Sequence, residues 1–309
     1  MLLLEHLSDL YLKHKDCLVQ PVSGFDLGGE YFNFQTSPTL MGVINLSPDS
    51  WYRESVCLSP ERAIERGIVL HAQGARILDL GAESTLAHAS LADQAEQCQK
   101  LTPVIQGLRR AGITVSVETY LAPVARACLE AGANILNLTG LAQIEEIYPM
   151  AAENGAGVIL CYVQGETARA VKDFEIPTDP IGALYEYFAR ECERASRFGV
   201  HKLILDPGLG FYYRNLTDGP TRVRYQMNAF LNSFRLHPLG FPICNALPHA
   251  FEFFGEEIRS AEPFFTSLAA LGGTHLFRTH EVSKVKAVLD TLDTYEPLGR
   301  QRKTPSSPD

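Results

Sequence analysis

The stretch SPERAIERGIVLHAQGARILD, residues 59–79, contains one complete helix-to-strand unit of the chain. Ser59 is a typical N-cap residue, and Pro60 suits the first turn of a helix. Apolar residues then recur at helical spacing until Gly74, which ends the predicted helix. The short apolar run Arg76–Asp79 follows at once and predicts a buried strand with a polar end. A helix, a glycine and a strand in this order are typical of a parallel β/α protein.

Eight short apolar runs of this kind follow one another between residues 40 and 280, and helix-like stretches separate them. Their number and order predict an α/β fold, a (β/α)8 TIM barrel. The runs are Leu40–Asn45, Arg76–Asp79, Thr114–Glu118, Asn134–Asn137, Gly157–Cys161, Lys202–Asp206, Phe241–Asn245 and His275–His280. In such a barrel the polar residues at the carboxyl ends of the strands face the active site. The polar residues at or just beyond these ends are Asn45, Asp79, Glu83, Glu118, Asn137, Asp206, Arg278 and His280.

The predicted barrel occupies residues 38–297, between an N-terminal extension and a tail. The extension, residues 1–37, combines an amphipathic helix with the hairpin pattern FDLGGEYFNF (residues 25–34), which we expect to cap the lower end of the barrel. Residues 298–309 are polar and rich in proline, which predicts a disordered tail. The long polar segment Gly165–Pro180 predicts a loop over the barrel mouth.

Composition excludes several kinds of partner. A formal net charge of -9 over 309 residues argues against nucleic acid as the main partner, because phosphate binding needs a basic face. The seven cysteines show no CxxC pair or zinc-like spacing, which indicates reduced thiols in a cytoplasmic protein. We find no pattern of a signal peptide or a membrane span and expect no membrane association.

Six motifs at the predicted strand ends resemble, in the same order, those of the dihydropteroate synthase family. They are MGVINLSPDSW (41–51), GARILDLGAEST (74–85), VSVETY (115–120), GANILNLTG (132–140), LILDPGLGF (203–211) and LFRTH (276–280). The resemblance implies that p-aminobenzoate displaces pyrophosphate from 6-hydroxymethyl-7,8-dihydropterin pyrophosphate. It also implies Mg2+ as cofactor and a homodimer.

The resemblance assigns four residues to the pterin. Asp206 matches the residue that binds the amino and ring N–H edge, and Asn137 supplies both a donor and an acceptor. Glu118 stands where the family usually has Asp, and Phe211 ends the matching LILDPGLGF motif. A flat, hydrogen-bonding ligand needs such groups because unpaired polar groups are costly to bury.

Four further residues match the family's side for pyrophosphate. Asn45 corresponds to the residue that contacts the metal and the pyrophosphate, and Arg278 and His280 correspond to the anion-binding pair. Thr85 adds a hydroxyl group. Because pyrophosphate leaves a delocalised pterin cation, we expect electrostatic stabilisation of the leaving group to carry most of the catalysis.

The chain departs from the family pattern where cations are expected. Leu86 follows Thr85 in place of the usual Arg. The seventh strand leads into CNALPHAFEFF (residues 244–254) in place of a Ser-Arg-Lys signature, and His249 falls near the missing Lys. A histidine there can donate a hydrogen bond, but it is shorter than Lys and mostly neutral at pH 7. The sequence therefore predicts that the side of the site for p-aminobenzoate lacks the cations that the family usually has there.

Two alternatives to a divergent synthase remain at this stage: a non-catalytic or regulatory pterin-binding homologue, and a related pterin-dependent transferase. The site residues also have structural interpretations. Asp206 and Asn45 would organise turns, Asn137 would cap a helix, Arg278 would pair with Glu281, and His249 would be an ordinary loop residue.

Overall fold

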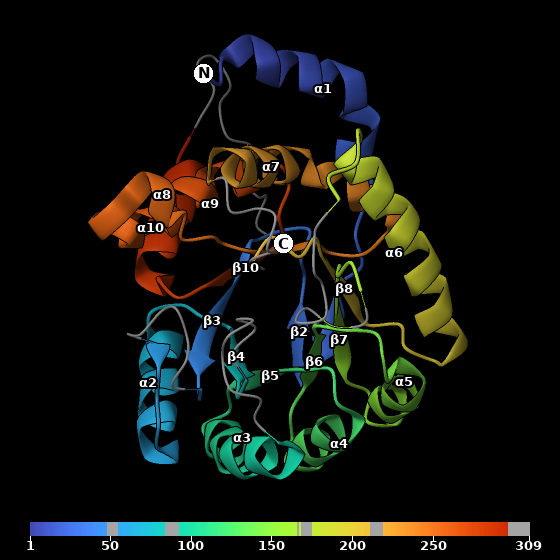
Figure 1. The fold of residues 1–309 in the computed structure, drawn as a ribbon, viewed down its shortest axis with the longest axis vertical. Helices are drawn as coiled ribbons and strands as arrows, with labels where there is room; N and C mark the ends of the chain where they lie inside the picture. Colours follow the sequence, from blue (N-terminus) through green and yellow to red (C-terminus); the bar gives the residue numbers. More distant parts are fainter. Residues whose placement is uncertain (48–54, 84–92, 166, 168–174, 211–218, 296–309) are drawn as a thin grey trace, which may run out of the picture.

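The computed structural model describes residues 1–47, 55–83, 93–165, 167, 175–210 and 219–295. Eight parallel strands form one sheet in the order β8-β7-β6-β5-β4-β3-β10-β9. Leu205 on β8 forms a parallel bridge with Ile243, just before β9, and this bridge closes the sheet into a barrel. Figure 1 shows the helices around the strands. The predicted TIM barrel, with its additional N-terminal helix and hairpin, is confirmed.

The elements alternate along the chain as the sequence predicts. The strands are β1 Phe25–Leu27, β2 Glu30–Phe32, β3 Thr39–Asn45, β4 Ile77–Gly81, β5 Thr114–Thr119, β6 Ile135–Leu138, β7 Gly157–Cys161, β8 Leu203–Asp206, β9 Cys244–Ala246 and β10 Leu276–Thr279. The helices are α1 Leu4–Leu18, α2 Pro60–Ala72, α3 Gln94–Arg110, α4 Ala122–Glu130, α5 Ile144–Glu153, α6 Pro180–Arg197, α7 Gly219–Asn232, η2 Ser233–Leu239, α8 Phe251–Phe254, η3 Gly255–Ser260, α9 Ala261–Leu271 and α10 Val282–Asp293.

The stretch at residues 59–79 folds as its residues require. The Ser59 side chain accepts a hydrogen bond from the backbone N of Arg62 at 3.3 Å and caps α2. Gly67 lies on the buried face of α2, where a Cβ atom would come within 2.5 Å of Leu108 Cδ2 on α3. This glycine therefore allows α2 and α3 to pack closely side by side.

The hairpin of β1 and β2 closes the amino-terminal end of the barrel. Leu27 and Phe32 are fully buried in a core that the hairpin shares with inward-facing strand residues. Those residues are Met41, Ile77, Ile135, Ile159, Ile204, Cys244 and Leu276. Because apolar side chains fill this end, the polar residues at the carboxyl ends of the strands form the functional end of the barrel.

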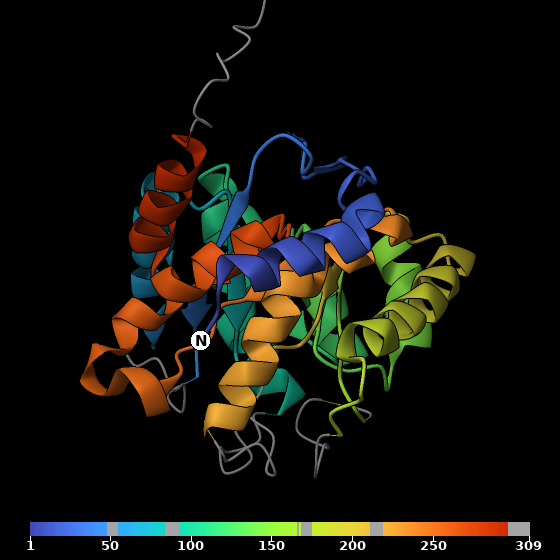
Figure 2. The same cartoon turned by 90° about the horizontal axis from the view of Figure 1, so that it is seen from above.

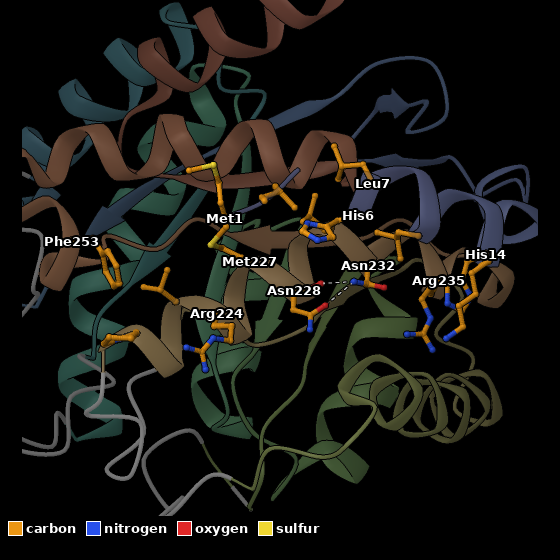
Figure 3. A pocket seen from close by; sticks show the side chains of 16 residues that line it. Met1, His6, Leu7, His14, Arg224, Met227, Asn228, Asn232, Arg235 and Phe253 are labelled. Carbon is orange, nitrogen blue, oxygen red and sulfur yellow. Dashed lines mark hydrogen bonds between the residues drawn. The ribbon is translucent and has the colours of Figure 1, made fainter. Parts of the chain in front are cut away.

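Helix α1 lies outside the strands, against η2 and beside α7 (Figures 1 and 2). A groove of about 750 Å³ separates α1 from α7 and is lined by apolar residues such as Leu7 and Met227 (Figure 3). None of the strand-end residues is among its described lining residues. Within the described ranges, no helix combines the length and the apolar character needed to cross a membrane.

Seven of the eight predicted strands differ from the observed ones at one end or both, and two of these differences have a clear physical cause. The run Phe241–Asn245 becomes the shorter strand β9, because Pro242 has no N–H for the ladder. The last run was predicted to reach His280, but β10 ends at Thr279. The backbone N of His280 donates instead to the side chain of Glu262 on α9.

One predicted loop, Gly165–Pro180, lies partly within the described residues. Before α6, the side chain of Gln164 donates to the backbone O of Glu175 and accepts from its backbone N, both at 2.8 Å. The middle of the predicted loop Gly165–Pro180 and the predicted tail at residues 298–309 lie outside the described residues.

Candidate functional site

Asp79 lies at the centre of a buried polar network near the carboxyl ends of the strands. Its Oδ1 atom accepts a hydrogen bond from Ser116 Oγ at 2.7 Å. Its Oδ2 atom accepts one from Asn137 Nδ2 at 3.0 Å and another from Arg278 Nε at 2.7 Å. Asp79 is fully buried, so these donors replace the water that it loses on folding. The network joins β4, β5, β6 and β10.

Arg278 points into this network and also bonds Glu118, with 2.7 Å between Arg278 Nη2 and Glu118 Oε2. Burial opposes its charge, but Asp79 and Glu118 outweigh that effect and raise the pKa of Arg278. The alternative pairing with Glu281 is wrong, because Glu281 accepts its hydrogen bonds from Arg259. Arg278 is therefore a cation held at the strand ends by two carboxylates.

Glu118 and Asp206 are acids that burial keeps partly protonated near neutral pH. Burial raises the pKa of Glu118 to about 7 and that of Asp206 to about 6. Asp206 Oδ1 accepts from the backbone N of Gly208 at 2.8 Å, so the turn interpretation describes part of its role. Asn137 Oδ1 is buried and has no hydrogen-bond partner in the described structure. These oxygens can receive hydrogen-bond donors from a ligand.

Asn45 ends β3 and is held by hydrogen bonds on both its backbone and its side chain. Its Nδ2 atom donates to Ser55 Oγ at 2.5 Å, and its backbone O accepts from Cys57 N at 2.8 Å. A Cβ atom at Gly81 would lie 3.8 Å from Asn45 Oδ1 and 3.9 Å from Glu118 Oε2. Two side-chain oxygens thus border the same glycine, which leaves space beside them.

His280 and His249 both face the carboxylate of Glu262. Glu262 Oε1 lies 2.9 Å from His280 Nδ1 and 3.3 Å from His249 Nε2. With Arg278, the two histidines line a small cavity of about 50 Å³. Gln226 also lines this cavity, and its buried Oε1 atom has no partner in the described structure. The structure therefore brings together three residues that were predicted separately from two strand ends.

Sequence reasoning missed three features of this region. Glu262 is the fully buried carboxylate that joins the two histidines, and Gln226 forms part of the cavity wall. Arg222 on α7 is buried and forms an ion pair with Glu252 on α8, so a cation from α7 reaches the segment after β9. One signal was present: Glu262 is the only charged residue in the apolar stretch AEPFFTSLAAL, and a buried carboxylate needs partners.

Two predicted site residues, Thr85 and Phe211, lie outside the described residues, as does Leu86. The other predicted residues all lie at the carboxyl end of the barrel or just beyond it.

Comparisons with known proteins agree with this arrangement. The family described as "Pterin binding enzyme" matches residues 41–280. The dihydropteroate synthase of Mycobacterium leprae (strain TN) is 31% identical over 264 residues, which cover 82% of this chain and 90% of that protein. The dihydropteroate synthase of a Synechocystis strain is 28% identical over 282 residues, covering 86% of this chain and 93% of the relative.

A solved structure supports the fold. The crystal structure of dihydropteroate synthase from Thermus thermophilus in complex with 4-aminobenzoate superposes with a TM-score of 0.73 at 24% identity. The superposition covers 88% of this chain and 100% of that one. Together with the family match over most of the barrel, from β3 to the residue after β10, these findings show that the chain belongs to the family of pterin binding enzymes.

Proposed function

We propose that the chain is a dihydropteroate synthase, which joins 6-hydroxymethyl-7,8-dihydropterin pyrophosphate to p-aminobenzoate and releases pyrophosphate. The observation that supports this most strongly is the unpaired, buried Oδ1 atom of Asn137. A buried acceptor without a partner is costly, and the N–H edge of a pterin supplies the missing donor. Asp206 and Glu118, also at strand ends, would accept the remaining pterin donors. Thr85 and Phe211 are assigned to the substrates by resemblance alone.

Arg278, His280 and Asn45 would hold the pyrophosphate. Arg278 contributes a permanent charge, and His280 contributes a ring that Glu262 orients. The oxygens of Asn45 and Glu118 beside Gly81 are the hard ligands that Mg2+ prefers, so the residues present fit this ion. When bound, Mg2+ would neutralise charge on the leaving pyrophosphate. Asn45 would be its ligand from the protein.

In this proposal the protein acts mainly by position and charge. The amine of p-aminobenzoate forms the new C–N bond at the methylene carbon of the pterin, the C–O bond to pyrophosphate breaks, and the amine nitrogen loses one proton to solvent. Arg278 and His280 stabilise the negative charge that grows on the departing oxygen. Asn137 and Asp206 hold the pterin ring so that its methylene carbon faces the amine.

A second candidate function is a pterin-binding homologue without synthase activity. One feature favours it: no Lys or Arg occurs between Arg235 and Arg259, where the resemblance predicts a Lys. An assay of purified protein for pyrophosphate release, with and without p-aminobenzoate and Mg2+, separates the two functions. Release that depends on the amine supports the synthase. Pterin binding without release supports the second function.

The cellular setting is part of the same proposal. All seven cysteines are free, and five of them are buried, as expected in a reducing compartment. We therefore propose a cytoplasmic enzyme, and we expect a homodimer formed through the outer helices.

Asp206→Ala should weaken pterin binding about tenfold or more. The substitution removes a charge-assisted hydrogen bond worth roughly 1.5 to 3 kcal/mol. Titration calorimetry with 6-hydroxymethylpterin measures the change, and Asp26→Ala at an exposed position of β1 is the control. A folded Asp206→Ala protein with unchanged pterin affinity would show that this carboxylate only organises the turn at Gly208.

A further inference from the structure

Glu262 is a fully buried carboxylate outside the set of residues that the resemblance assigns. Its Oε2 atom accepts hydrogen bonds from Thr279 Oγ1 and from the backbone N of His280 and Glu281, the last two at 3.0 and 3.2 Å. Its Oε1 atom faces His280 Nδ1 and His249 Nε2. The backbone contacts fix the carboxylate, and the carboxylate in turn fixes both rings.

The nearby charges make the histidines the natural partners of Glu262. Arg278 on β10 bonds Asp79 and Glu118, while Arg259 in η3 and Lys284 on α10 bond or face Glu281. Among the described contacts, the Oε1 atom of Glu262 is therefore paired with the two imidazole rings. Hydrogen bonds from the two histidines outweigh burial and hold the pKa of Glu262 below its usual range.

We propose that Glu262 is a positioning residue that holds the rings of His249 and His280 toward pyrophosphate and lets His280 bind this anion as an imidazolium. This inference rests on the proposed function for the identity of the anion. The geometry supports it, because His249 comes from the segment after β9, where the Lys is expected, and His280 follows β10. Both rings line the same cavity as Arg278.

His280 should gain its charge when the anion binds. In the empty site burial lowers the pKa of His280, although Glu262 opposes this effect. Since Nδ1 of His280 faces Glu262, the proton that turns this ring into an imidazolium would lie on Nε2. A bound pyrophosphate would stabilise that proton from one side while Glu262 stabilises it from the other. Pyrophosphate binding should therefore be coupled to proton uptake.

Calorimetry of the full chain with pyrophosphate and Mg2+, in buffers of different ionisation enthalpy, measures this uptake. We expect close to one proton more per bound pyrophosphate in the wild type than in Glu262→Gln at pH 7.5 to 8. For each unit by which the pH rises, the affinity of the wild type for pyrophosphate should fall by a factor about ten times larger than that of the variant. Protons exchanged by pyrophosphate itself are common to both proteins and cancel in the comparison.

Two further variants separate positioning from folding. Glu262→Asp should recover part of the proton uptake, since it keeps a carboxylate at the same point. Glu281→Gln removes a neighbouring buried carboxylate that pairs with Arg259, and it should retain the wild-type uptake. Circular dichroism confirms that each variant is folded. Equal uptake in wild type and folded Glu262→Gln would overturn the proposal, as would the absence of pyrophosphate binding.

The same proteins test whether the three residues bind a metal ion and whether the chain makes product. Stoichiometric Zn2+ binding that is lost in Glu262→Gln would identify a metal site and overturn the proposed proton uptake by His280. If the wild type forms dihydropteroate but its proton uptake does not depend on Glu262, this inference is refuted and the proposed function stays intact. Uptake that depends on Glu262, but without product formation, would support the inference while refuting the synthase activity.

Discussion

Replacing Arg278 by Ala should lower the free energy of unfolding by about 3 to 5 kcal/mol, the usual cost of removing one partner from a buried ion pair. Asp79 is fully buried and would lose its only cationic hydrogen-bond partner within the described structure, retaining Ser116 and Asn137. Glu118 would lose the cation that lowers its pKa and would take up a proton, which limits the loss. Urea denaturation monitored by circular dichroism measures the change.

The surface pair of Lys286 and Asp290 gives a matched control for Arg278. Lys286 Nζ and Asp290 Oδ2 are 2.5 Å apart, but both side chains are about half exposed. Lys286→Ala should therefore cost about 1 kcal/mol or less. The double variant Arg278→Ala with Asp79→Ala should lose less than the sum of the two single variants, because it removes both charges. A loss within about 1 kcal/mol for Arg278→Ala would show that water reaches this network and replaces the guanidinium.

The sequence predicted the barrel well because its pattern is local. Each strand is a short apolar run, and each helix begins and ends at residues with defined backbone preferences, such as Ser59 and Gly74. The hairpin was also predictable, since the turn at Gly28-Gly29 sets its register within ten residues. Both glycines have positive φ angles, +65° and +91°, which other residues rarely adopt.

The partners within the site could not be predicted in the same way. Arg278 bonds an aspartate 199 positions away, and the choice between Asp79 and Glu281 depends on which side of β10 faces the barrel interior. Glu262 lies on a helix, where a glutamate ordinarily faces water. Strand-end position alone therefore located the site, whereas the hydrogen bonds within it depended on side-chain directions that the structure reveals.

The acids at the strand ends lower the stability of the fold when the site is empty. Asp206 is buried and Glu118 is largely buried near Asp79, and Arg278 is the cation that bonds into this group of carboxylates. Burial raises the pKa values of Glu118 and Asp206, and repulsion from the neighbouring carboxylates raises them further. A ligand that brings N–H donors would relieve this repulsion, so the same residues oppose stability in the empty protein and favour pterin binding.

Glu118→Gln should therefore become more stable relative to the wild type as the pH rises from 4.5 to 8, by about 3 kcal/mol. The folded pKa of Glu118, about 7, lies above the usual 4.5, so its stabilising contribution is complete below pH 4.5 and is lost as the pH passes 7. His275 has the opposite trend, because burial lowers its pKa to about 3, but this trend is common to both proteins and cancels. Urea denaturation at four pH values measures the difference.

Asp179→Asn is the control for this prediction. Arg235 lowers the pKa of Asp179 to about 2, so this carboxylate is ionised in both the folded and the unfolded state above pH 5. Its loss should therefore not change how the free energy of unfolding depends on pH there. If the free energies of unfolding of the wild type and Glu118→Gln change in parallel from pH 4.5 to 8, Glu118 is ionised throughout. Arg278 would then compensate the charge of Glu118 fully.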